Sequence, residues 1–111
     1  MKPTLKIIGL AMLILFCIDQ VAAQHKKLAQ YDSLIALAET DSARIHLIGF
    51  KLDVLSTVNL DSAISLAQKT LKEADSIGYY SGQVNLNTNL INNYSYKRNF
   101  KAASRQIKEM K

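Results

Sequence analysis

Hydrophobic positions recur along most of the chain at the three- and four-residue spacing of amphipathic helices. Residues 42–57 are apolar on nearly all sides, so that segment needs a neighbour on two faces and is expected at the centre of the core. The pattern predicts an all-α fold with helices over residues 25–39, 42–57, 61–77, 83–96 and 100–110. The first of these carries an apolar stripe at Leu28, Tyr31, Leu34, Ile35 and Ala38.

Two short segments about 40 residues apart, 59–63 and 99–103, have the same order of residue types. Each begins with an Asn, continues with a large apolar residue, and has an Ala four positions after the Asn. An Asn in this place can cap a helix by accepting from the free N–H groups of the first turn. The recurrence predicts a repeat protein, with Asn59 and Asn99 each starting the second helix of a helical hairpin.

Other boundaries follow from local chemistry. Thr40 and Asp41 offer a capping side chain for the helix over 42–57. Gly78 is suited to the left-handed conformation that ends a helix. Residues 79–82 are expected to connect the two hairpins, and residues 97–99 to form the tight turn of the second one.

The first 23 residues resemble a secretory signal peptide. Lys2 and Lys6 precede an apolar run over residues 7–18, and the small residues Val21 and Ala23 suit cleavage before Gln24. The run is shorter than the roughly 20 apolar residues that span a bilayer. We expect the mature chain to be exported to the periplasm or the extracellular space; the alternative is an uncleaved leader that tethers the protein to the inner membrane.

Cys17, the only cysteine, lies inside the apolar run. It follows the bulky Phe16, whereas a bacterial lipoprotein signal has a small residue there, so no lipid anchor is expected. Residues 24–111 contain no cysteine, which excludes disulfides and cysteine-based metal sites from the mature chain.

Basic residues exceed acidic residues by five in the whole chain. The leader holds two lysines and one aspartate, so residues 24–111 carry twelve basic and eight acidic side chains. Half of these basic side chains lie in the last fifteen positions, where they are interpreted as a solvated helix face. No aromatic residues alternate with them as on a nucleic-acid-binding surface, so a nucleic-acid partner is not expected.

Residues 41–110 resemble tetratricopeptide repeats. The resemblance rests on Leu90 and Tyr94, on the Lys-Arg-Asn-Phe turn over residues 97–100, and on Ala103 in the following helix. The Asp-Ser-Ile-Gly segment over residues 75–78 is similar to a connection in the longer variant of this repeat. That variant occurs in the extracytoplasmic regions of bacterial sensor kinases and regulators. The resemblance implies antiparallel helical hairpins stacked as a short right-handed solenoid.

This resemblance gives a domain organisation. A signal peptide over residues 1–23 is followed by an N-terminal capping helix over 24–40. A first hairpin then covers 41–78, and a second covers 79–111 and is incomplete at its C-terminus. Such a last unit would leave an apolar face in water.

In tetratricopeptide repeats the first helix of each hairpin lines a concave surface that binds extended peptides or partner helices. The candidate surface is therefore one face of the helix over 83–96, whose Asn side chains can donate to and accept from a peptide backbone. A solvated polar face is the alternative. Substituting Asn89 and Asn92 by Ala is expected to abolish partner capture without lowering the melting temperature. The candidate binding residues are Asn85, Thr88, Asn89, Asn92 and Tyr96.

No catalytic set can be assembled from the sequence. His46 has no second metal ligand or nucleophile beside it and is interpreted as a surface histidine, and no glycine-rich phosphate loop is present. We expect a non-catalytic interaction module without metal or cofactor, which binds a protein or peptide, as the N-terminal sensory or scaffold part of a signalling protein. The alternative is a structural protein that self-associates through its open C-terminal repeat face.

Overall fold

The computed structural model describes residues 2–110. Within that part of the chain all regular secondary structure is helical, so the prediction of an all-α fold is confirmed. Short turns join the helices. They are α1 (Lys2–Ala36), α2 (Asp41–Val58), α3 (Leu60–Ile77), α4 (Tyr80–Tyr96) and α5 (Phe100–Glu109).

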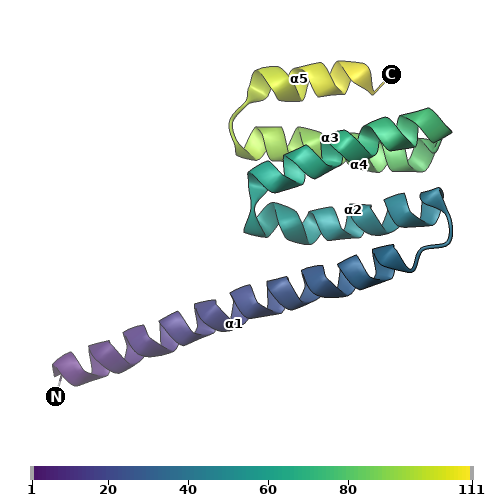
Figure 1. Ribbon diagram of the computed structural model, residues 1–111. Helices are drawn as coiled ribbons and strands as arrows, with labels where there is room; N and C mark the ends of the chain where they lie inside the picture. Colours follow the sequence, from purple (N-terminus) through teal and green to yellow (C-terminus); the bar gives the residue numbers. More distant parts are fainter. Residues whose placement is uncertain (1, 111) are drawn as a thin grey trace.

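Each helix packs against the next one in the chain. In addition, α2 contacts α4 directly, although α3 lies between them in the sequence. Figure 1 shows the chain reversing direction at each turn, with α1 and α5 at opposite ends of the stack. The N-terminal half of α1 extends well beyond the other helices. The direct contact between α2 and α4 is what positions the candidate site.

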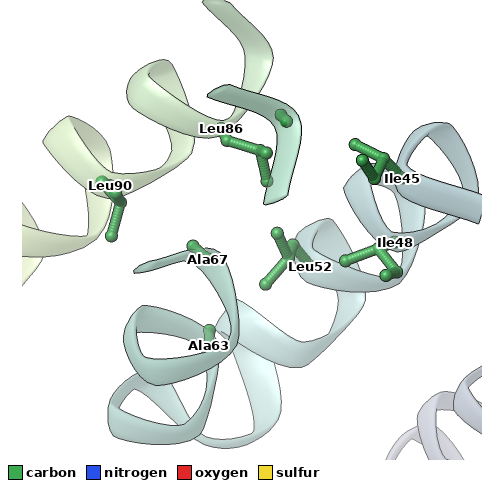
Figure 2. Packing of buried hydrophobic residues seen from close by; sticks show 8 residues of the cluster. Ile45, Ile48, Leu52, Ala63, Ala67, Leu86 and Leu90 are labelled. Atoms are coloured by element: carbon green, nitrogen blue, oxygen red, sulfur yellow. The ribbon is translucent and has the colours of Figure 1, made fainter. Parts of the chain in front are cut away.

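The core lies where α2, α3 and α4 meet (Figure 2). α2 supplies three large aliphatic side chains, as expected for the helix that is apolar on nearly all sides. α3 supplies alanines, whose small size lets its backbone approach the neighbouring helices closely. The buried cluster consists of Ile45, Ile48, Leu52, Ala63, Ala67, Ala74, Leu86 and Leu90.

Side-chain caps start three of the helices at the predicted places. The Asn59 Oδ1 accepts from the Ser62 N–H at 3.0 Å, and the Asn99 Oδ1 accepts from the Ala102 N–H at 3.2 Å. At the start of α2 the capping residue is Thr40, whose Oγ1 accepts from Ala43 N–H at 3.1 Å. The predicted capping role of Asn59 and Asn99 is therefore confirmed.

α3 and α4 end in the same way. Gly78 adopts the left-handed conformation with φ of 68°, and the following Tyr79 N–H donates to the Ala74 carbonyl at 2.9 Å. At the end of α4, Arg98 has φ of 58° and the Asn99 N–H donates to the Tyr94 carbonyl at 2.8 Å. Both are Schellman turns, one made with glycine and the other with a residue that has a Cβ.

The predicted start of the fourth helix at residue 83 is wrong, because α4 begins at Tyr80 and includes Gly82. Gly82 is buried, and a methyl group added there would lie 2.7 Å from Cε1 of Tyr79 and 3.2 Å from Cγ2 of Ile45. Glycine at this position makes room for the Tyr79 ring against the first turn of α4. Its function is packing rather than helix termination.

α1 is continuous across the predicted cleavage site before Gln24, and it ends at Ala36 rather than at residue 39. Leu28, Tyr31 and Ile35 of the predicted stripe are half-buried, but Leu34 is exposed. The segment from Lys6 to Ala36 is long and apolar enough to cross a membrane, a property that signal sequences share.

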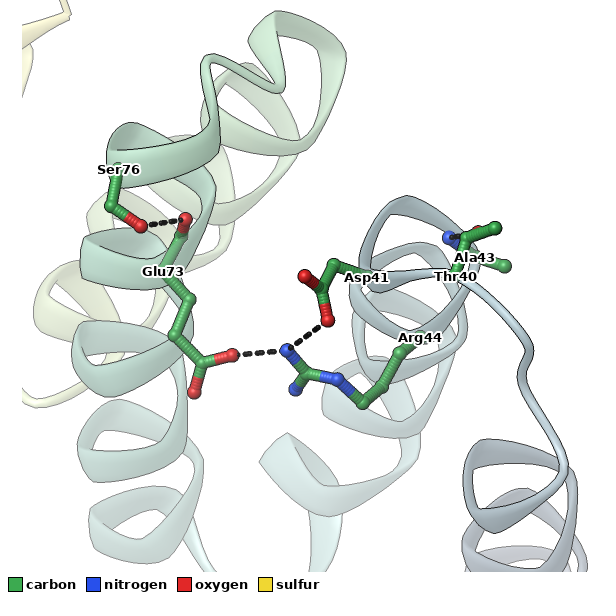
Figure 3. A network of polar contacts seen from close by, with 6 residues as sticks. All are labelled: Thr40, Asp41, Ala43, Arg44, Glu73 and Ser76. Atoms are coloured by element: carbon green, nitrogen blue, oxygen red, sulfur yellow. Dashed lines mark hydrogen bonds and ion pairs between the residues drawn. The ribbon is translucent and has the colours of Figure 1, made fainter.

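Ion pairs join α2 to both of its neighbours in the chain. Lys51 Nζ lies 2.6 Å from Asp32 Oδ1 of α1. The Arg44 guanidinium pairs with Glu73 of α3 and lies 3.6 Å from Asp41 Oδ1 (Figure 3). The hydrogen bond to Glu73 raises the pKa of Arg44, so this side chain stays charged.

Candidate functional site

A groove of about 340 Å³ lies between α2 and α4. Its floor is made of Leu52 and Leu86, which belong to the buried core. One wall comes from α2 and the other from α4. The wall residues are His46, Gly49, Phe50 and Asp53 on α2, and Asn85, Thr88, Asn89 and Asn92 on α4.

The two walls are built to the same pattern. Each helix contributes four residues at steps of three, one and three, which places them on a single helical face. Because α2 and α4 contact each other, the two faces meet along one groove. The four α4 residues of the groove are all polar. The four α2 residues opposite them are two with aromatic rings, one glycine and one aspartate.

Four of the five predicted binding residues line this groove: Asn85, Thr88, Asn89 and Asn92. Tyr96 does not belong to the lining; it lies at the last position of α4 and is 74% exposed. The structure thus brings most of the predicted residues together with α2, and their binding role stays a prediction.

Asn89 is held by a buried neighbour. Asn93, only 1% exposed, donates from Nδ2 to Asn89 Oδ1 at 2.9 Å and to Ser56 Oγ of α2 at 3.0 Å. The bond to Ser56 links α2 to α4 at the end of the groove. Asn89 therefore also serves the fold, so replacing it by Ala is not expected to leave stability unchanged.

Asn87, on another face of α4, is buried as well. Its Nδ2 donates to the Gln83 carbonyl at 2.9 Å, and its Oδ1 accepts from Gln106 Nε2 of α5. It thereby helps to fix α5 against α4. The asparagines of α4 consequently comprise two buried structural residues, Asn87 and Asn93, and three that line the groove, of which Asn89 also bonds to Asn93.

The α2 wall of the groove does not follow from the sequence prediction; His46 is exposed, as expected for a surface histidine, but it also lines the groove. The His46 ring meets Phe50 edge to face with centroids 4.9 Å apart, and the Phe50 ring stacks on Tyr31 of α1 at 6.4 Å. These three rings form an aromatic row along the α2 wall. The signal was available, since residues 46, 49, 50 and 53 have the same spacing as the α4 residues.

A larger cavity, of about 590 Å³, lies between α3, α4 and α5. Its charged lining residues are two basic and two acidic side chains. Several of its polar groups already bond to one another: Gln68 Nε2 donates to Tyr94 Oη at 2.5 Å, and Gln106 pairs with Asn87. In the smaller groove, Asn85 and Asn92 make no side-chain hydrogen bond to any other described residue. The smaller groove is the better candidate because four of the five predicted binding residues line it.

Residues 2–110 contain no group of three His, Cys, Asp or Glu side chains that could hold a metal ion. Comparison with protein families, curated proteins and solved structures finds no match to this chain. The function is therefore inferred from the groove itself.

Proposed function

We propose that the protein is a non-catalytic protein–protein interaction module that binds an extended peptide in the groove between α2 and α4. In this proposal α2–α3 and α4–α5 are tetratricopeptide-like hairpins stacked as a short right-handed solenoid, and α1 caps the N-terminal end. The contact between α2 and α4 supports this arrangement, because first helices of successive hairpins pack against each other in such arrays.

The observation that carries the proposal is the pair of matching helical faces around one groove. The Asn85 and Asn92 amides are exposed and make no side-chain bond within the described chain, so both can pair with a peptide main chain. Leu52 and Leu86 are buried beneath the groove, so the apolar surface open to a peptide side chain is that of Phe50, which is 46% exposed. Main-chain pairing beside one apolar contact suits an extended segment.

The test uses a random heptapeptide phage library panned on the full chain in a mild detergent. Wild-type protein should enrich a limited set of peptides, and the variant with Asn85→Ala and Asn92→Ala should lose most of that binding with an unchanged melting temperature. The control variant carries Ser65→Ala and Lys69→Ala on α3, outside the groove, and should bind as wild type does. Equal peptide binding by the two variants would refute the proposal.

We further propose that the protein is exported from a bacterial cytoplasm, with residues 1–23 as a signal peptide. The apolar N-terminal part of α1 supports either export or tethering, because signal sequences and membrane spans share its length and composition. Mass spectrometry of the N-terminus after expression in a bacterial host separates the two. A chain beginning at Gln24 in the periplasmic fraction indicates export with cleavage, and a chain retaining residues 1–23 in the membrane fraction indicates a tether. A chain retaining residues 1–23 in the cytoplasmic fraction would refute export.

Self-association is a second candidate function, favoured by the outer face of α5. Phe100 is 63% exposed and Ile107 55% exposed, and both lie on the same side of this helix at a spacing of two turns. Apolar surface of this kind can pair with a second copy. Light scattering over a concentration series tests self-association. The average mass of the wild-type protein should rise with concentration, and that of Ile107→Glu should stay close to the mass of one chain.

A further inference from the structure

We propose that the peptide bound between α2 and α4 carries a basic residue, best an arginine, whose cationic group pairs with Asp53 and lies against the ring of Phe50. This inference rests on the proposed function, since it assigns chemistry to the ligand of the same groove.

The charge of the groove favours a cation. Asp53 is the only Asp, Glu, Lys or Arg residue among the groove-lining residues, and its side chain is exposed. The ion pairs within residues 2–110 use other acids, and the nearby Lys51 is already paired with Asp32. No cation of the described chain therefore neutralises Asp53, although the protein as a whole is basic. A ligand cation would find the carboxylate free.

An aromatic ring stands beside this carboxylate. Phe50 precedes Asp53 by three positions, so the two side chains share one face of α2. Phe50 is 46% exposed, and its ring stacks on Tyr31 and meets His46 edge to face. A ligand cation can lie against the part of the ring face that these two neighbours leave open. Arginine suits the pair best because its planar group can stack on a ring and bond a carboxylate through two N–H groups.

The groove has room for such a side chain at Gly49. A methyl group added at this residue would meet no atom within 4 Å, so the space above α2 is open between His46 and Asp53. The opposite wall offers the Asn85 and Asn92 amides to the peptide main chain. A long basic side chain can therefore cross the groove from the α4 wall to Asp53.

The test again begins with the random heptapeptide phage library panned on the full chain in mild detergent. The enriched peptides should share an Arg or Lys at one position. Labelled synthetic copies with that residue replaced by Gln should bind about three- to tenfold more weakly in fluorescence anisotropy. The difference should shrink as the salt concentration rises. Enriched peptides without a basic residue would overturn this inference and leave the proposed function standing, whereas failure to enrich any peptide would refute the proposed function.

Two variants locate the effect. Asp53→Asn should weaken the Arg peptide about three- to tenfold and leave its Gln copy unaffected, which is the signature of a direct pair. Gly49→Leu should block both peptides without lowering the melting temperature, since the space at Gly49 is open. The matched control is Asp75→Asn, which removes an equal charge from α3 outside the groove. Asp75 lines the larger cavity, so an equal loss of Arg-peptide binding with Asp75→Asn would indicate either general electrostatic attraction or binding at that cavity, and either would overturn the inference.

Discussion

Asparagine has two separate roles in α4, and burial rather than sequence spacing distinguishes them. Asn93 is enclosed and its amide satisfies partners on two helices, whereas Asn92, its neighbour in sequence, is exposed at the groove. A helical pattern treats both as polar residues and predicts both on the outside. Only the position of α2 reveals that Ser56 is the partner of Asn93.

Replacing Asn93 by Ala should lower the free energy of unfolding by about 2 kcal/mol, because it removes two hydrogen bonds and leaves a small cavity. Asn89→Ala should cost about 1 kcal/mol, since Asn93 keeps its bond to Ser56. Urea denaturation followed by circular dichroism measures both. Asn92→Ala, the control, should be close to neutral, and equal losses for Asn89→Ala and Asn92→Ala would contradict the network.

Arg98 is the one described residue other than glycine with a positive φ. A Cβ in the left-handed region costs roughly 1 kcal/mol or more, which Gly78 avoids in the equivalent turn. Arg98→Gly should therefore stabilise the chain by about 0.5–1 kcal/mol, the gain being reduced by the greater freedom of glycine in the unfolded chain. The reverse change, Gly78→Ala, should destabilise by about 1 kcal/mol. A thermal melt in which Arg98→Gly unfolds at a lower temperature would disprove this account of the turn.

At the scale of the helices, two internal glycines offer a matched comparison. Gly49 in α2 faces open space, whereas Gly82 in α4 is covered by the Tyr79 ring and Ile45. Gly49→Ala should thus stabilise α2 by about 0.5–1 kcal/mol through helix propensity alone. Gly82→Ala should destabilise by about 1–3 kcal/mol, because the added methyl displaces the ring. Chemical denaturation should show that the free energy of unfolding rises for Gly49→Ala and falls for Gly82→Ala. Changes of the same sign would contradict this difference between the two glycines.

The helices show what the sequence can and cannot predict. Capping is a local interaction, so the starts of α3 and α5 follow from Asn59 and Asn99, and the end of α3 follows from Gly78. The start of α4 could not be predicted, because Gly82 is needed for a contact with residues of the preceding turn and of α2. For the same reason only one wall of the groove could be predicted. The α4 wall follows from the spacing of polar residues along that helix, whereas the α2 wall depends on the contact between α2 and α4.

At the scale of the molecule, burial begins only where α1 reaches α2. The residues from 6 to 23 are all exposed, while Leu28, Tyr31 and Ile35 are half-buried. Ile35 packs on the core, and Tyr31 stacks on Phe50 at the edge of the groove. The two halves of one helix therefore contribute differently: the first adds apolar surface without internal contacts, and the second completes the fold.

A pair of truncations tests this division. Removing residues 1–23 should change the free energy of unfolding by less than about 0.5 kcal/mol, because exposed side chains far from the core add little to stability. Removing residues 1–39 should cost at least about 3 kcal/mol, since it uncovers the side of α2 that Tyr31 and Ile35 cover and deletes the Asp32 partner of Lys51. Urea denaturation of the two truncated chains and of the full chain, all in the same detergent, provides the comparison. A large loss on removing residues 1–23 alone would mean that the exposed half of α1 also supports the fold. A small loss on removing residues 1–39 would mean that α2, α3 and α4 form a self-sufficient unit to which α1 is only attached.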